Sequence, residues 1–167
     1  MIDSFVSEKK KMRRVFFDLD GVVFDFVAGF ESVMGFPIPS GSKDLVESYE
    51  LVDRDFFLRL PAIDDAVSLM YRLRDAGFEI AILSSAGDYR YDEVVAHKLA
   101  SLAAIGLDWV EDVRFVEHSY EKALYAAEGV LIDDREKSLV PFREAGGIAF
   151  YYEEGLGDSI FDSLVSL

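Results

Sequence analysis

The sequence predicts an α/β fold in which a parallel sheet carries helices on both faces. One reason is a continuous apolar strand, Val15 to Phe17, of the kind that parallel sheets cover on both sides. A second reason is the regular alternation of short apolar strands with helical segments between residues 64 and 166. A third is that several of these strands end in polar or acidic residues, where open α/β sheets bind their ligands.

The composition fits one domain and narrows its partners. The chain has 167 residues, of which 51% are hydrophobic, which is enough for a sizeable core and a small insertion. Lys and Arg total 17 against 32 Asp and Glu, so the net charge is −15. Such a surface disfavours duplex nucleic acid and anionic lipid. A small anionic substrate stays compatible, because local groups and a metal can invert the field inside a pocket.

Two absences restrict the chemistry and the location further. The chain has no cysteine, which excludes disulfides, thiolate nucleophiles and zinc–thiolate sites. It also has no apolar run of the length that a bilayer requires, and no apolar signal core follows the basic residues near its start. We therefore expect a cytoplasmic protein. The sequence is compatible with a homodimer but does not fix the oligomeric state.

We expect a catalytic core interrupted by one small insertion. Residues 1–13 read as a loose tail, residues 14–25 and 63–167 as the core, and residues 26–62 as a helical cap inserted after the first strand. The first helix is expected from Phe24 to Met34, where Gly35 ends it. Further helices are expected at 40–49, 53–60, 64–76, 91–105, 119–128, 137–145 and 158–166, with Asp64 as the N-cap of the 64–76 helix, and strands at 78–83, 113–116, 130–132 and 147–151.

Acidic residues end the first and fourth of the expected strands. Asp18 and Asp20 follow the first, and Asp133 with Asp134 follows the strand at 130–132. Parallel strands bring these ends to one edge, where four carboxylates at close range would repel one another and raise their pKa values. A hard divalent cation with oxygen ligands, Mg²⁺ above all, resolves this repulsion. Taken alone, Asp18 and Asp20 are equally well explained as an ordinary strand-to-turn ending, and for Asp133 with Asp134 that ending is the more common explanation.

Hydroxyls and a lysine belong to the same edge. Ser84 and Ser85 follow the strand at 78–83, and Lys122 opens the helix expected near residue 119. A lysine there can bind phosphate as a point charge. The ordinary alternatives are a solvated lysine and serines that cap a turn. The occurrence of all these groups together, each at a strand or helix end, favours a site.

These residues resemble the four motifs of the haloacid dehalogenase (HAD) superfamily of phosphotransferases. The motifs are matched by Asp18-Leu19-Asp20-Gly21-Val22, by Ser84, by Lys122 and by Asp133-Asp134. The stretch from Asp20 to Phe30 is similar to the extended first motif of one branch, the 5'(3')-deoxyribonucleotidases. The resemblance covers the chain from Arg14 to about Ala149. It implies an HAD-like Rossmannoid three-layer sandwich, with the insertion at 26–62 as a small cap over the active site.

The resemblance also implies a mechanism. Asp18 matches the nucleophile that becomes an aspartyl-phosphate. Asp20 matches the general acid that protonates the leaving alcohol and then serves as base for the hydrolytic water. Mg²⁺ would be held by Asp18, by Asp20 through its backbone carbonyl, and by Asp133 and Asp134.

Other residues match substrate-binding positions. Ser84, Ser85 and Lys122 would bind phosphate oxygens. Phe26 occupies the position of an aromatic that contacts the nucleobase, and packing in the cap core is its alternative. Lys98 matches a lysine in the helix that follows the second motif, although we favour a solvated helix face for it.

We therefore expect magnesium-dependent hydrolysis of a nucleoside monophosphate. Alternatives with the same chemistry are a sugar phosphate or a nucleic-acid terminal phosphate. A nucleotide-binding regulatory protein on the same fold is the non-enzymatic alternative, although both Asp18 and Asp20 are present. A response-regulator receiver domain fits poorly, because its phosphoacceptor ends a later strand than its acidic pair.

Overall fold

The protein is built around a five-stranded parallel sheet. The computed structural model describes residues 14–38 and 55–167. Within them the strand order is β3-β2-β1-β4-β5, and every neighbouring pair is parallel. The strands are β1 (Arg14–Phe17), β2 (Glu79–Ser85), β3 (Asp112–Val116), β4 (Val130–Asp133) and β5 (Ile148–Tyr151). The sheet confirms the predicted α/β class.

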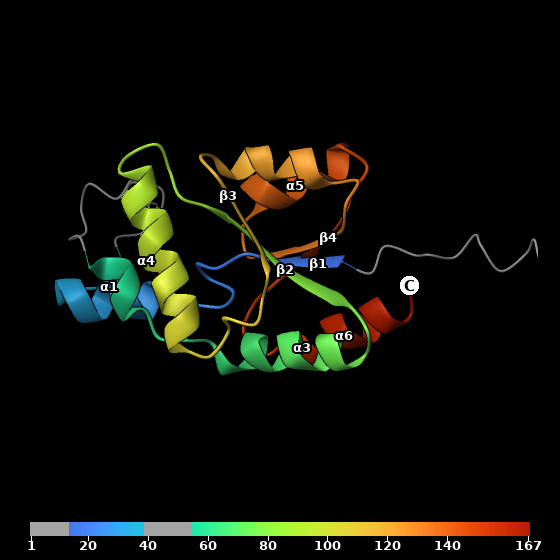
Figure 1. The fold of residues 1–167 in the computed structure, drawn as a ribbon, viewed down its shortest axis with the longest axis horizontal. Coiled ribbons are helices and arrows are strands. Elements are labelled where there is room, and N and C mark those ends of the chain that lie inside the picture. Colours follow the sequence, from blue (N-terminus) through green and yellow to red (C-terminus); the bar gives the residue numbers. More distant parts are fainter. Residues whose placement is uncertain (1–13, 39–54) are drawn as a thin grey trace, which may run out of the picture.

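Helices form a layer on each side of this sheet. In Figure 1, α5 lies above the sheet and α3 and α6 lie below it, whereas α1 and α4 lie together at one end. None of the helices within the described residues is long and apolar enough to span a bilayer. The helices are α1 (Phe26–Met34), η1 (Phe56–Arg59), α3 (Asp64–Asp75), α4 (Tyr91–Ala104), η2 (Ser119–Tyr125), α5 (Glu136–Glu144) and α6 (Gly157–Val165), where η marks a 3-10 helix.

Apolar residues of the central strands alternate between the two layers. Phe16 and Leu131, which pair across β1 and β4, belong to the apolar cluster beneath α5. Phe17 and Ile132, the next pair in register, belong to the cluster that α3 and α6 complete. Because side chains alternate along a strand, an uninterrupted apolar run is what a sheet covered on both faces requires.

The described parts of the insertion, 26–38 and 55–62, are joined to the core at their base. The amide of Asp25 donates to the carbonyl of Pro61 (2.8 Å), and the amide of Ile63 donates to the carbonyl of Val23 (2.7 Å). Phenylalanines from α1 and η1 share one apolar cluster with the central strands: Phe26, Phe30, Phe56 and Phe57. The expected tail at 1–13 and the expected helix at 40–49 lie outside the described residues.

Several expected boundaries differ from the structure, and three of these differences have a clear structural cause. Asp64 is not the N-cap of α3, because the extended backbone of Ile63 holds that position and helical geometry begins at Asp64. The 119–128 segment is a shorter 3-10 helix with i to i+3 hydrogen bonds. Strand β2 continues through Ser84 and Ser85, because both residues pair with β3.

Candidate active site

Two aspartates lie side by side at the carboxyl end of the central strands. Asp133 is the last residue of β4, and Asp18 directly follows the neighbouring β1. The amide of Asp18 donates to the carbonyl of Ile132 (3.0 Å), so it continues the ladder between the two strands. The strand order changes direction between β1 and β4, which is where open α/β sheets bind ligands.

A third carboxylate completes an acidic cluster. Oxygens of Asp18, Asp133 and Asp134 all lie within 4.8 Å of one another. Gly21 faces this cluster with a left-handed φ of +84°, and a Cβ at this position would collide with the Asp134 carboxylate. Glycine is therefore needed both for the turn and for the close approach.

Lys122 is inserted into this cluster from η2. Its ammonium lies 2.8 Å from Asp18 Oδ1 and 2.6 Å from Asp133 Oδ2. The exposed fractions of Lys122, Asp133 and Asp18 are 1%, 0% and 5%. Lys122 thus brings one positive charge to a cluster of three carboxylates, and these two ion pairs involve two of them.

Burial and charge act in opposite directions on these groups. Burial and, after it, the Asp18 charge raise the pKa of Asp133, Lys122 opposes both, and the result is a pKa of about 7. Burial by itself would lower the pKa of Lys122, but the charges of Asp133 and Asp18 outweigh it and raise that pKa above its ordinary value. Lys122 therefore stays protonated, and Asp133 is the group whose protonation changes near neutral pH.

The cluster fits a hard divalent cation. All of its donors are carboxylate oxygens, the donor type that Mg²⁺ prefers. The negative charge of the carboxylates attracts such a cation. Because Gly21 has no side chain, the Asp134 carboxylate has room to occupy its position in the cluster. An added cation would also hold Asp133 in its ionised form.

Asp20 lies apart from that cluster in a different environment. Its Oδ2 accepts a hydrogen bond from the Lys98 ammonium (2.7 Å), and its carboxylate is not one of the three that converge. The two acids of the Asp18-Leu19-Asp20 motif thus face different lysines.

Lys98 corrects an expectation. We favoured a solvated helix face, but the side chain is 2% exposed and donates to Asp20, to the carbonyl of Ser85 (2.8 Å) and to Ser84 Oγ (3.3 Å). A signal for this burial exists in the sequence. Val94, Lys98 and Leu102 are spaced four residues apart, and the two flanking residues are apolar, so the three share one face of α4.

The predicted phosphate-binding serines stand beside this lysine. Ser84 is buried at the end of β2, and its hydroxyl accepts from Lys98. Ser85 is half-buried and presents its carbonyl to the same ammonium. The structure therefore brings Ser84 and Ser85 to Asp20, and Lys122 to Asp18.

Phe26, the candidate base-contacting residue, lies in the apolar core. Its exposed fraction is 1%, and its ring meets Phe56 edge-on at 5.2 Å between centroids. This environment is the cap-core packing that we kept as the alternative. No part of the ring is open to a nucleobase in this conformation.

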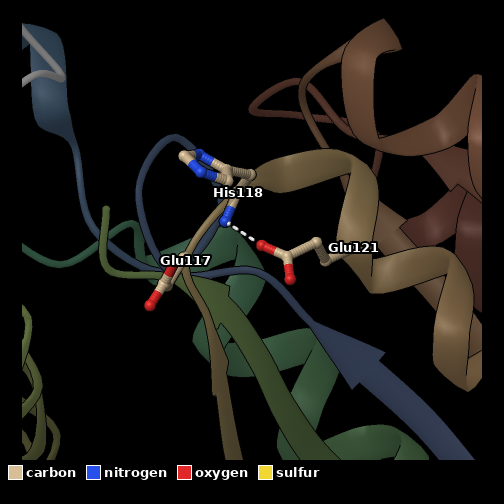
Figure 2. A group of neighbouring side chains, drawn as sticks. All are labelled: Glu117, His118 and Glu121. Atoms are coloured by element: carbon tan, nitrogen blue, oxygen red, sulfur yellow. Dashed lines mark hydrogen bonds between the residues drawn. The ribbon is translucent and has the colours of Figure 1, made fainter. Parts of the chain in front are cut away.

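A second group of candidate metal ligands precedes Lys122. Figure 2 shows Glu117, His118 and Glu121 where β3 leads into η2, and their ligand atoms lie within 4.8 Å of one another. Glu121 accepts a hydrogen bond from the His118 amide (2.7 Å), which caps the start of η2. The His118 ring stacks on Tyr120. These contacts explain the group as the start of the helix that carries Lys122.

Comparisons with known proteins identify the fold. No protein-family model matches the sequence, and no curated protein matches it significantly. A predicted phosphatase from Clostridium acetobutylicum is similar in structure, with a TM-score of 0.59 and 14% identity over 93% of this chain and 99% of that one. An HAD family hydrolase from Deinococcus radiodurans R1, solved with bound phosphate and sodium, has a TM-score of 0.52 and 19% identity over 92% and 88% of the two chains.

An enzyme of different chemistry is also similar. L-2-haloacid dehalogenase from Xanthobacter autotrophicus has a TM-score of 0.55 and 17% identity over 93% of this chain and 83% of its own. Likeness at these identities establishes the HAD-like fold alone. The activity has to be argued from the residues of the site.

Proposed function

We propose that the protein is a magnesium-dependent phosphatase that hydrolyses small phosphate monoesters through an aspartyl-phosphate on Asp18. The observation that carries this proposal is the convergence of the carboxylates of Asp18, Asp133 and Asp134, two of which pair with the Lys122 ammonium. Such a cluster favours a cation and, through it, an anionic substrate. It would repel an anion that approached without a cation.

In the first step, an Asp18 carboxylate oxygen attacks phosphorus and forms a P–O bond. The bond from phosphorus to the leaving oxygen breaks, and its electron pair stays on that oxygen. Asp20 donates its proton there, so an alcohol leaves. Lys122, Ser84 and Ser85 would bind the phosphate oxygens that do not react, because phosphoryl transfer depends chiefly on positioning and charge stabilisation.

In the second step, Asp20 is a carboxylate and takes a proton from water. The water oxygen bonds to phosphorus, the P–O bond to Asp18 breaks, and the electron pair returns to the Asp18 carboxylate. Inorganic phosphate leaves. Mg²⁺ held by Asp18, Asp133, Asp134 and the Asp20 carbonyl would neutralise phosphate charge in both steps.

Asp20 also supports phosphoryl transfer over dehalogenation. An alkoxide leaving group needs a proton, whereas a halide leaves as a stable anion and needs none. A second carboxylate two residues after the nucleophile, near but outside the acidic cluster, suits the first requirement.

For the substrate we propose a nucleoside monophosphate. The support is the sequence likeness of the stretch from Asp20 to Phe30 to deoxyribonucleotidases. Because Phe26 is buried, a base contact would have to come from other residues or from a rearranged cap. A sugar phosphate is the principal alternative.

The test is phosphate release from a panel, with Mg²⁺ or with chelator. The panel contains 5'- and 3'-monophosphates of ribo- and deoxyribonucleosides, sugar phosphates, a 5'-phosphorylated oligonucleotide and an L-2-halo acid. We expect phosphate from nucleotides only with Mg²⁺, and no halide. Asp18→Asn should be inactive, whereas Asp162→Asn, the same change on the exposed face of α6, should match wild type.

The outcomes separate the alternatives. Preference for sugar phosphates would replace the substrate class but keep the mechanism. Nucleotide binding without turnover would favour the regulatory protein. Activity of Asp18→Asn would contradict the nucleophile assignment.

A further inference from the structure

Lys98 is a buried cation outside the cluster of the proposed nucleophile. Its ammonium makes its shortest contact, 2.7 Å, with Asp20 Oδ2, and it also donates to the carbonyl of Ser85 and to Ser84 Oγ. It lies 4.9 Å from the centre of the Phe57 ring. Three acceptors and an aromatic face leave the ammonium little freedom to move.

These contacts make the two oxygens of Asp20 unequal. Oδ2 is held by Lys98, whereas Oδ1 is buried and accepts no hydrogen bond from the described residues. A buried carboxylate oxygen without a donor is unfavourable unless a proton or a ligand donor reaches it. Oδ1 is therefore the oxygen whose geometry leaves it open to a partner from outside the described residues.

We infer that Lys98 is a positioning residue that holds Asp20 by Oδ2 and presents Oδ1 to the leaving group and then to the hydrolytic water. The inference rests on the proposed phosphatase function and assigns Lys98 no contact with the substrate. A bond on one oxygen fixes the carboxylate plane, and proton transfer requires the other oxygen within hydrogen-bond reach of its target.

The inserted segment takes part in this positioning. Phe57 belongs to η1, and its ring lies against the Lys98 ammonium. One turn further along α4, the Ser101 hydroxyl donates to the carbonyl of Phe57 (2.7 Å). The segment after the first strand thus braces the helix that orients the acid. The Lys98 side chain therefore links the packing of the inserted segment to proton transfer by Asp20.

The first experiment compares leaving groups. kcat/KM reports the step up to loss of the alcohol, so it is measured for an alkyl phosphate, which needs a proton donor, and for p-nitrophenyl phosphate, which does not. Lys98→Met should lower the alkyl value by about 10- to 100-fold, part of what general acid catalysis supplies, and the aryl value by less than about threefold. Equal losses on both substrates would mean that Lys98 binds phosphate and would overturn the inference.

The second experiment is a double-mutant cycle with Asp20→Asn. Where Asp20 has already been replaced, Lys98→Met should leave the alkyl kcat/KM unchanged within about twofold. The stability of the same four proteins is measured by urea denaturation in chelator. Lys98→Met should lower the urea midpoint of the wild-type protein but not that of the Asp20→Asn variant. A further loss of alkyl kcat/KM in the Asp20→Asn background would overturn the inference.

Controls separate positioning from folding. Tyr152→Phe removes one hydrogen bond of a buried side chain, between Tyr152 and Asp65 of α3, and should leave the alkyl-to-aryl ratio unchanged. If Lys98→Met does not fold, Phe57→Leu tests the same point, because it removes the ring contact but keeps both charges. It should lower the alkyl-to-aryl ratio, and an unchanged ratio would overturn the inference. A wild-type protein inactive on both substrates would overturn the proposed function as well.

Discussion

Replacing Lys122 by methionine should destabilise the metal-free protein by about 3–5 kcal/mol at pH 8, because removal of one partner leaves a buried charge without compensation. The 1% exposed ammonium lies 2.8 Å from Asp18 Oδ1 and 2.6 Å from Asp133 Oδ2. Methionine keeps the bulk of the side chain and removes the charge. The lost term is therefore electrostatic, with little contribution from packing.

The loss should shrink as the pH falls. Burial and the Asp18 charge raise the pKa of Asp133 from 3.8 to about 7. Between about pH 4 and pH 7 the Asp133 carboxyl is protonated in the folded state but ionised in the unfolded state. Its contribution to the free energy of unfolding therefore falls as the pH rises through this range. Without Lys122 the pKa of Asp133 rises further, and each added unit is worth about 1.4 kcal/mol. At pH 5.5 a proton therefore replaces part of the lost ammonium charge.

Urea denaturation followed by circular dichroism, at pH 8 and pH 5.5 in chelator, measures both effects. Lys137→Met is the matched control on the exposed side of α5 and should lose at most about 1 kcal/mol, because it can give up only a surface contact. Added Mg²⁺ should recover part of the loss in Lys122→Met, since a cation can supply the missing charge. A loss below about 1 kcal/mol at pH 8, or equal losses at both pH values, would refute the electrostatic reasoning.

Two further predictions concern the support of the site. Gly21→Ala should lower both stability and the Mg²⁺-dependent shift in melting temperature, because the new methyl collides with the Asp134 carboxylate. Gly146→Ala shares the left-handed strain, at φ +87° with nothing within 4 Å, and should cost about 1–2 kcal/mol while keeping the Mg²⁺ response; equal responses in the two variants would contradict this account. Tyr152→Phe should cost about 1.5–3 kcal/mol by urea denaturation, since its buried hydroxyl donates to Asp65 (2.9 Å), and a changed kcat/KM would argue against a purely structural role.

The carboxylates at the strand ends could be predicted from the sequence because the pattern that places them is local. Asp18 follows an apolar run, and Asp133 closes another, so each position depends on a few neighbouring residues. Parallel pairing then brings the ends together whatever the intervening chain does. Lys122 followed from the same logic, since a helix after a strand begins at that edge.

Lys98 and Phe26 could not be placed in this way. The partner of Lys98 is Asp20, 78 residues away, and which face of α4 turns inward depends on how the helix packs on η1. For Phe26 the motif position suggested a ligand contact, whereas burial depends on the partner ring of Phe56. Spacing along α4 marks Lys98 as inward-facing but does not give its partner, and for Phe26 tertiary packing alone decided.

The hydrogen bond from the Asp18 amide to Ile132 gives the proposed nucleophile no hinge of its own. Its backbone can move away from Asp133 only if β1 and β4 separate, and these are interior strands of the sheet. Exchange of this amide with solvent should therefore be as slow as that of the most protected amides in the protein. The bond-forming group is therefore lost only together with the fold.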